Sequence, residues 1–265
     1  MPDALVERDG HVMIITMNRP QRMNALTGQM LIRMYDAYTE ASADPEVRCI
    51  VVTGAGGNFC SGADLRAMAG DADNTDPLDT RARMAEDPDI VYKALFRHFR
   101  PTKPIVAAVE GVAIAGGTEL LLATEIRVAG ESARFGVSEA RWSLYPMGGA
   151  AARLPRQIPY AHAAEILLTG KHITAAEALE VGLIGHVVSD GSALEKALEI
   201  AAAVAANGPL ATAAITRTLH ECDGMGLDEA LRHEWGYGQD VLHSNDAKEG
   251  PRAFAEKRAP DFTGT

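Results

Sequence analysis

Apolar and polar positions alternate at the start of the chain and then follow a helical period. Two alternating segments, Ala4–Arg8 and His11–Met17, flank Asp9-Gly10, a dipeptide typical of tight turns between paired strands. Thr27, a favoured helix cap, precedes apolar positions spaced three and four apart. The apolar stripe comprises Met30, Leu31, Met34, Tyr35 and Tyr38. The pattern predicts a β-hairpin followed by an amphipathic helix.

The middle of the chain repeats the order strand, glycine-bearing turn, helix, without detectable sequence repeats. The predicted strands are Cys49–Thr53, Ile105–Val109 and Ile126–Ala129. The first leads through the turn 54–57 to a short helix opened by residues 62–65. The second leads through Gly111 to Gly116-Gly117, where a helical pattern begins. This order predicts an α/β core.

Residues 71–89 form an acidic, irregular stretch between these units. Its acidic residues are Asp71, Asp73, Asp76, Asp79, Glu86, Asp87 and Asp89. Two interpretations stay open from the sequence: a surface loop or mobile lid, and a solvated connector.

Helical patterns dominate the rest of the chain. The predicted helices cover residues 160–169, 174–181, 191–206, 209–220 and 227–242. The break Asn207-Gly208-Pro209 predicts a boundary between a core, 1–207, and a C-terminal helical region, 208–265. That region is too small and too amphipathic for an obvious independent fold. We expect its apolar stripes to pack on the core or on a second subunit.

Composition narrows the class of protein. The chain has 265 residues, 47% of them hydrophobic, and a formal net charge of −11. This charge disfavours nucleic-acid binding, and a polyanionic ligand would need a local basic patch. Three irregularly spaced cysteines (Cys49, Cys60 and Cys222) give neither a disulfide framework nor a metal pattern. With no signal-peptide pattern and no membrane-spanning run, we expect a cytoplasmic protein without membrane association.

The candidate chemistry begins at Gly116-Gly117. Glycines at a helix start leave N–H groups exposed, with the positive end of the helix dipole behind them. Such groups can stabilise negative charge developing on an oxygen. A second glycine-bearing turn, before Leu65, offers the N–H of Ala63. Each turn alone also fits a simple strand–helix connection.

Two carboxylates accompany these turns. Glu119 lies in the first turn of the predicted helix, a position that the dipole favours by itself, and Glu139 follows 20 residues later. Glu139 alone would be a surface carboxylate; together the two can move protons next to a carbonyl. Phe59 replaces the third glycine of a dinucleotide fingerprint, which argues against a Rossmann-type dehydrogenase. No phosphate-binding loop, serine-hydrolase motif or metal-ligand spacing is present.

At these residues the chain resembles the enoyl-CoA hydratase/isomerase (crotonase) superfamily, and its hydratase-like members in particular. The similarity runs nearly end to end. The matching segments are Met17–Leu26, Phe59–Leu65, Gly111–Glu119, Leu167–Gly170 with Ala175–Ala178 and Gly182-Leu183, and Phe254–Arg258 with Pro260 and Phe262. The resemblance implies a spiral of ββα turns and a C-terminal helical region that forms trimers, which can pair into hexamers.

The resemblance also implies an acyl-CoA thioester as substrate, with no metal or redox cofactor. The N–H groups of Ala63 and Gly116 would hold the thioester oxygen, and Glu119 and Glu139 would add water to a trans-2-enoyl-CoA, giving a 3-hydroxyacyl-CoA. Which glutamate is acid and which is base stays open. A Δ3,Δ2-enoyl-CoA isomerase that uses Glu139 alone is the nearest alternative, and a noncatalytic acyl-CoA binder is a more distant one.

Further residues are expected to bind substrate by position. They are Arg22, Ala25, Asp64, Leu65, Arg66, Trp142 and Lys257. Arg22, Arg66 and Lys257, with Arg258, are the candidates to meet the CoA phosphates. The family's hydratases usually carry a glycine-rich run after the second glutamate. Here Trp142, Leu144, Tyr145 and Met147 occupy that stretch, which leaves the shape of the acyl pocket open.

Overall fold

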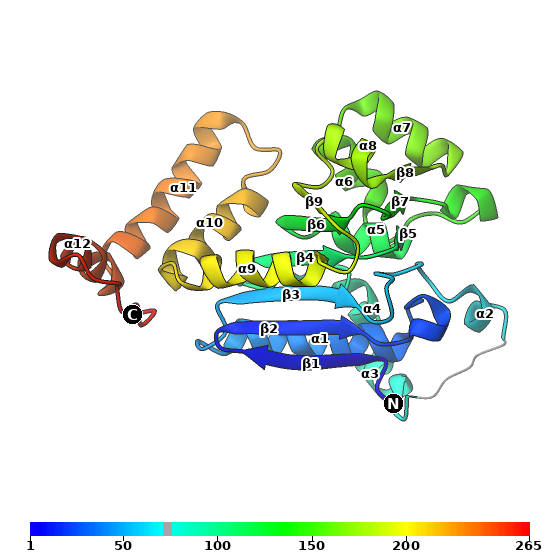
Figure 1. Cartoon of the computed structure of the whole chain (residues 1–265), viewed down its shortest axis with the longest axis horizontal. Helices are drawn as coiled ribbons and strands as arrows, with labels where there is room; N and C mark the ends of the chain where they lie inside the picture. The colour runs from blue at the N-terminus through cyan, green and yellow to red at the C-terminus, as the bar shows by residue number, and fades with distance from the viewer. Residues whose placement is uncertain (71–75) are drawn as a thin grey trace.

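In the computed structural model, which describes residues 1–70 and 76–265, a layered α/β core carries an arm of C-terminal helices (Figure 1). The strands are β1 (Ala4–Asp9), β2 (Val12–Met17), β3 (Cys49–Gly54), β4 (Ile105–Val109), β5 (Val112–Ile114), β6 (Ile126–Gly130), β7 (Arg134–Gly136), β8 (His172–Thr174) and β9 (His186–Val188). Over these described residues, the strand order is β1-β2-β3-β4-β6-β9 in one sheet and β5-β7-β8 in a second.

The helices follow the strands in chain order. They are α1 (Gly28–Ala43), α2 (Leu65–Met68), α3 (Thr80–Glu86), α4 (Ile90–Lys93), α5 (Gly116–Leu121), α6 (Ala150–Gln157), α7 (Tyr160–Thr169), α8 (Ala175–Glu180), α9 (Ala193–Ala205), α10 (Pro209–Glu221), α11 (Leu227–Leu242) and α12 (Asp246–Glu256). Two short 3-10 helices, η1 (Pro20–Arg22) and η2 (Glu139–Trp142), lie beside the candidate site.

The larger sheet starts from the predicted hairpin. β1 and β2 pair antiparallel, with Asp9 opposite Val12, so the Asp9-Gly10 turn is confirmed. The Thr27 hydroxyl accepts the N–H of Met30 at 3.1 Å, which confirms it as the cap of α1. The following strands, from β2 to β9, all run parallel.

Helices cover both faces of this sheet, as a parallel sheet requires. On one face, alternate β3 residues Ile50 and Val52 belong to the same buried cluster as Met34 and Tyr38 of α1. On the other face, Cys49 and Val51 pack with the alanine stripe of α9. The strand is apolar throughout because each of its two faces lies in a core.

Consecutive ββα units stack on one another, and this stacking builds the site. β4 pairs in parallel with β6, and β5, which follows β4, pairs in parallel with β7, which follows β6. An isolated parallel bridge between Cys60 and Ala113 adds the preceding unit, which begins with β3. The units of β4 and β6 thus each contribute one strand to both sheets, the arrangement expected of successive turns of a spiral.

The C-terminal helices leave the core after α9. α9 and α10 meet at an angle of 112°, and α11 and α12 continue away from the sheets (Figure 1). The Arg48 side chain donates to the carbonyls of Ala205 and Phe262, and His220 of α10 contacts the Glu125 carboxylate. In the described residues, no single helix has the length and apolarity to cross a membrane; the bent pair α9–α10 meets those criteria only together. The division at residue 207 stays a prediction.

The interpretation of residues 71–89 needs a correction. Residues 71–75 lie outside the described part of the chain. Beyond them, the stretch lies at the surface as expected, except for Asp76, but its interpretation as irregular is wrong, because Thr80–Glu86 is helix α3, whose first turn the Asp79 carboxylate caps. Asp76 is buried and forms a two-pronged ion pair with Arg33 of α1, at 2.6 and 2.7 Å. Acidic residues here act as a cap and a buried partner, roles that a charge pattern does not distinguish from solvation.

Candidate active site

Two backbone N–H groups from consecutive turns of the spiral lie side by side. A Cβ added at Gly116 would lie 3.8 Å from the Ala63 nitrogen, and one added at Gly62 would lie 3.2 Å from the Gly116 nitrogen. Neither the Ala63 nor the Gly116 N–H donates to an acceptor within the described chain. The structure therefore brings together the two amides that the sequence singled out, with both hydrogens unused.

Pairing with the segment around Leu26 sets the direction of the Ala63 amide. Leu26 donates to the Gly62 carbonyl at 2.7 Å and accepts the Asp64 N–H at 3.1 Å, which forms a parallel bridge opposite Ala63. In an extended segment, successive N–H groups point in opposite directions. The Ala63 N–H therefore points away from Leu26 and toward the start of α5.

The Gly116 amide is set by a strained backbone. Ala115 precedes α5 with φ 52° and ψ −122°, a conformation that side chains other than glycine rarely adopt. Its N–H donates to the Gly136 carbonyl at 2.8 Å, so pairing with the next turn of the spiral holds the strain in place. The sharp change of direction starts α5 with the Gly116 N–H free.

Glu119 lies three residues along α5 from Gly116, and its carboxylate is almost fully buried, with 4% of the residue exposed. Its Oε1 atom accepts the N–H of Ala150, at the start of α6, at 3.0 Å. Burial raises the pKa of Glu119, while the N–H groups of Ala150, Gly148 and Gly149 oppose that shift. A turn and a helix start thus hold the ionised form of this carboxylate in a site that otherwise disfavours charge.

Glu139 is the first residue of η2 and is half-buried. Burial, and also the charge of Glu119, raises its pKa from 4.5 to about 7. Its Oε2 atom is buried, and no described residue offers that atom a hydrogen bond. The two predicted carboxylates are therefore electrostatic neighbours in different environments: Glu119 is tied to amides, and Glu139 is poised near neutral pH.

The loop residues predicted to bind substrate gather around Ala63. Ser61 donates through its N–H to the Met23 carbonyl at 3.0 Å, which places the segment of Arg22 and Ala25 beside the segment of Ala63. The Asp64 carboxylate caps α2 and pairs with the buried Arg19 at 2.9 Å. Leu65 and Arg66 are exposed on α2. The roles of all five predicted residues toward a ligand stay predictions.

Two predicted substrate contacts lie apart from that loop. Trp142 ends η2, three residues after Glu139, and is 66% exposed; Tyr145 beyond it is 67% exposed. Lys257 ends α12, which Figure 1 places at the end of the molecule opposite α2. Within one chain, Lys257 therefore does not join Arg22 and Arg66.

The sequence interpretation missed the turn Gly148–Ala150 and Arg153. Its available signal was the pair Gly148-Gly149 before an alanine-rich segment, which is typical of a helix start with exposed N–H groups. Cys60, in contrast, is fully buried, and burial raises the pKa of its thiol to about 12, as fits a core residue.

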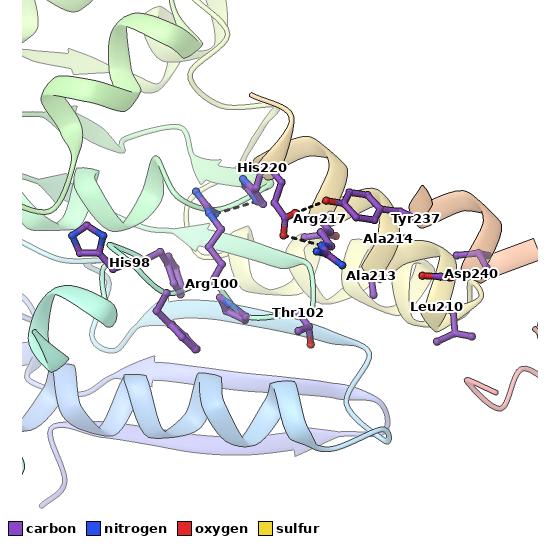
Figure 2. A pocket seen from close by; sticks show the side chains of 16 residues that line it. His98, Arg100, Thr102, Leu210, Ala213, Ala214, Arg217, His220, Tyr237 and Asp240 are labelled. Carbon is purple, nitrogen blue, oxygen red and sulfur yellow. Dashed lines mark hydrogen bonds and ion pairs between the residues drawn. The ribbon is translucent and has the colours of Figure 1, made fainter. Parts of the chain in front are cut away.

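A cavity of about 780 Å³ lies elsewhere, between the segment before β4 and helices α10 and α11. In Figure 2, Arg100 and His220 point toward one another across it, and Arg217 lies against the Tyr237 ring, 4.2 Å from its centroid. None of the predicted site residues is among the described residues that line this cavity. In the described chain, no group of three or more His, Cys, Asp or Glu residues is arranged to hold a metal ion.

The chain is similar to known proteins along nearly its whole length. Residues 7–265 match the family model described as enoyl-CoA hydratase/isomerase. The chain is 58% identical to enoyl-CoA hydratase EchA19 of Mycobacterium tuberculosis, over 98% of this chain and 96% of that protein. It is 37% identical to carnitinyl-CoA dehydratase of Salmonella typhi, over 97% of both chains.

Solved structures give the same result for the fold. An enoyl-CoA hydratase of Mycobacterium tuberculosis superposes with a TM-score of 0.87 at 39% identity, over 100% of both chains. An enoyl-CoA hydratase of Bacillus anthracis superposes with a TM-score of 0.89 at 33% identity, over 99% of this chain and 100% of that one. The expected crotonase-like spiral is confirmed, and the chain belongs to the enoyl-CoA hydratase/isomerase family.

Proposed function

We propose that the chain is an enoyl-CoA hydratase, which adds water to a trans-2-enoyl-CoA and yields the 3-hydroxyacyl-CoA. One observation carries the proposal: the unused amides of Ala63 and Gly116 lie together, and Glu119, one helical turn beyond Gly116, is an electrostatic neighbour of Glu139. The names of the relatives support it, since several are hydratases or a dehydratase of CoA thioesters.

In the proposed reaction, the thioester oxygen accepts hydrogen bonds from Ala63 and Gly116. These bonds draw electrons away from the double bond, and the β-carbon becomes electrophilic. As water attacks that carbon, negative charge builds on the thioester oxygen, where fixed amides stabilise it best. Each such donor is worth about 3–4 kcal/mol in a transition state.

The two carboxylates take different roles in this proposal. Glu119, whose ionised form the amides of the 148–150 turn support, is the base that removes a proton from water. Glu139, with a pKa of about 7, supplies a proton to the α-carbon. The β-carbon gains OH, the α-carbon gains H, and one proton must then pass from Glu119 back to Glu139. An isomerase needs a single carboxylate, and the buried, amide-bound Glu119 therefore favours hydration over the isomerase alternative.

The remaining parts of the substrate are assigned by position. We place the CoA phosphates near Arg22 and Arg66, beside the loop of Ala63, and the acyl chain toward the exposed apolar segment that begins at Trp142. No step of the proposed reaction is routed through a metal or a redox cofactor.

The C-terminal helices support an assembly of three or six copies. α11 has 16 residues and buries none of them, while Leu227, Trp235 and Leu242 are 74%, 71% and 67% exposed. Burial of such side chains on a second copy is favourable at about 25 cal/mol per Å². In a trimer or hexamer, Lys257 would act on a neighbour's substrate. Sedimentation equilibrium tests this, and a purely monomeric chain at micromolar concentration would contradict it.

The test of the function is turnover. Purified chain is supplied with trans-2-enoyl and 3-enoyl thioesters of several acyl sizes, and the absorbance of the conjugated thioester is followed, which falls on hydration of a 2-enoyl substrate and rises on isomerisation of a 3-enoyl one. Hydration of 2-enoyl substrates supports the proposal. Conversion of 3-enoyl thioesters without any hydration would make the chain an isomerase, and binding without turnover would make it an acyl-CoA binder.

A further inference from the structure

Arg153 reaches back over the turn that binds Glu119. Its N–H completes the first turn of α6 by donating to the Gly149 carbonyl at 2.9 Å. Its guanidinium donates to the Gly148 carbonyl from Nη1 at 2.8 Å, and to the Phe96 carbonyl from Nη2 at 2.8 Å. A third contact, from Nη1 to the Leu95 carbonyl, is 3.2 Å long. The side chain therefore joins the turn to the segment that follows α4.

The turn is confined between two charges. A Cβ added at Gly148 would lie 2.7 Å from Glu119 Oε2, and one added at Gly149 would lie 2.9 Å from Arg153 Nη1. Gly149 also has φ +112°, a conformation that favours glycine. Carboxylate, turn and guanidinium are thus packed in contact, with no room for a side chain between them.

The planar peptide couples the two contacts. In a trans peptide, the carbonyl of Gly148 and the N–H of Gly149 point in opposite directions. Arg153 holds that carbonyl, so the Gly149 N–H is directed away from Arg153 and toward Glu119, whose pKa this N–H lowers. The hydrogen bond from Arg153 to the Gly148 carbonyl therefore fixes the direction of the Gly149 N–H on the opposite side of the peptide.

The charge of Arg153, like its hydrogen bond to the turn, favours the ionised form of Glu119. Burial lowers the pKa of Arg153 to about 10, and the charge of Glu119 opposes that shift, so the guanidinium stays protonated at neutral pH. In return, Arg153 lowers the pKa of Glu119.

We propose that Arg153 is a positioning residue for the reaction: by holding the carbonyl side of the Gly148–Ala150 turn, it directs the amide side at Glu119 and keeps that carboxylate placed and ionised. The inference rests on the proposed function, because it assigns Arg153 to the base of that reaction.

The experiment compares Arg153→Met with a matched control, Arg127→Met. Arg127 is also buried, donates to the carbonyls of Leu183, Leu122 and Thr124, and has a pKa lowered to about 10 by burial, but it holds no part of the turn. We expect Arg153→Met to lower kcat about ten- to a hundredfold with little change in KM, as a misplaced catalytic group does. The acidic limb of its kcat/KM profile should move to higher pH. Arg127→Met should lower Tm and leave that limb in place.

A second readout does not depend on turnover. The carboxylate stretch of Glu119 is titrated by infrared difference spectroscopy and assigned by its loss in Glu119→Gln. In Arg153→Met the midpoint should rise relative to the wild-type chain, and an unchanged midpoint together with wild-type kcat would overturn the proposal. If no enoyl thioester is hydrated by the wild-type chain, the proposed function fails, and the titration alone decides the role of Arg153.

Arg153→Lys covers the case in which the methionine variant does not fold. Lysine keeps the charge but lacks the planar fork, so it cannot hold the Gly148 and Phe96 carbonyls together. Because the charge is kept, we expect the Glu119 midpoint to rise less than in Arg153→Met, and kcat to fall by about threefold or more. Wild-type kcat in Arg153→Lys would show that the fork is not needed and would overturn the inference.

Discussion

Ala150 donates its backbone N–H to the Glu119 carboxylate at 3.0 Å, although 31 residues separate the two in the chain. This bond joins the start of α6 to α5, two helices that belong to different ββα units. It gives a buried carboxylate the partners that an ionised group needs when water is excluded. The contrast between Glu119 and its less bonded neighbour Glu139 is the basis of the predictions on acid and base.

Replacing either glutamate should remove most of the activity. Glu119→Gln and Glu139→Gln keep the side-chain volume but cannot exchange a proton, so each should lower the hydration rate by at least about 10²-fold. Steady-state turnover of crotonyl-CoA measures this. Glu195→Gln, in the first turn of α9 and exposed, is the matched control and should keep wild-type rates. Near-native rates in both site variants would refute the assignment.

The rate of hydration should fall as pH rises through neutrality. The proposed acid, Glu139, has a pKa of about 7, raised first by burial and further by the charge of Glu119. Above that pH it loses the proton that it must donate. Glu119→Gln removes the neighbouring charge, so the Glu139 pKa should fall toward its ordinary value. Infrared titration of both proteins checks this, and a Glu139 midpoint unchanged by Glu119→Gln would show that the two do not interact.

The same raised pKa predicts a gain in stability on mutation. A carboxyl group whose pKa is higher in the folded than in the unfolded state destabilises the folded state increasingly as pH rises from about 4.5 to about 7. Glu139→Gln should therefore have a higher Tm than the wild-type chain at pH 8, and the difference should shrink toward pH 5. Thermal unfolding across this range tests it; a Tm difference that grows toward acid pH has the wrong sign.

Substitution of the adjacent glycines Gly116 and Gly117 by alanine should have different effects, the first on kcat and the second on Tm. A Cβ at Gly116 would meet only the flexible end of Leu26, at 2.8 Å, but would lie near the Ala63 amide. A Cβ at Gly117 would meet the Cys60 carbonyl at 2.4 Å, which is backbone and cannot move freely. Gly116→Ala should thus lower kcat about tenfold or more with a small change in Tm. Gly117→Ala should lower Tm by several degrees.

Equal effects of the two substitutions on kcat and Tm would contradict this distinction. Circular dichroism melts and turnover of crotonyl-CoA, measured on the same preparations, supply both numbers. Gly57→Ala is no suitable control, because Gly57 itself has φ +77°. Gly185→Ala, just before β9, whose added Cβ would come no closer than 3.9 Å to the Arg127 carbonyl, should change neither quantity adversely.

Arg66 and Lys257 should affect binding more than chemistry. If each meets a CoA phosphate at the surface, its loss costs about 0.5–1 kcal/mol, which corresponds to a KM raised about two- to fivefold at unchanged kcat. The effect should weaken as salt increases. Lys196→Ala, which removes a surface ion pair on α9, is the control. A lower kcat with unchanged KM would remove the phosphate assignment.

Local signals in the sequence predicted much of the fold. The Asp9-Gly10 turn and the Thr27 cap depend on neighbours within a few residues, and both are confirmed. The helices α6 and α12 were missed, and each contains an interior proline, Pro155 and Pro251. A proline removes one backbone hydrogen bond and argues against a helix when the sequence is read alone.

The candidate site was predicted only in part, for a related reason. Glycine-bearing turns pointed to Ala63 and Gly116, since exposed amides follow from local chain geometry. The partner of Glu119, the turn that begins at Gly148, lies on a different unit of the spiral, and no local pattern states which turn will face which carboxylate. No local pattern indicates the role of Arg153 either, because its acceptors include the carbonyl of Phe96, 57 residues earlier in the chain.

The bridge between Cys60 and Ala113 has a consequence for chain synthesis. It joins the segment of Ala63 to that of Gly116. The hydrogen-bond donors of Glu119, in contrast, come from residues near 150, which are synthesised later. A nascent chain that ends before residue 148 contains the amides of Ala63 and Gly116 but lacks the N–H groups that stabilise the Glu119 carboxylate. Catalytic competence therefore appears only after more than half of the polypeptide has been made, and N-terminal fragments that fold without α6 should be inert toward thioesters.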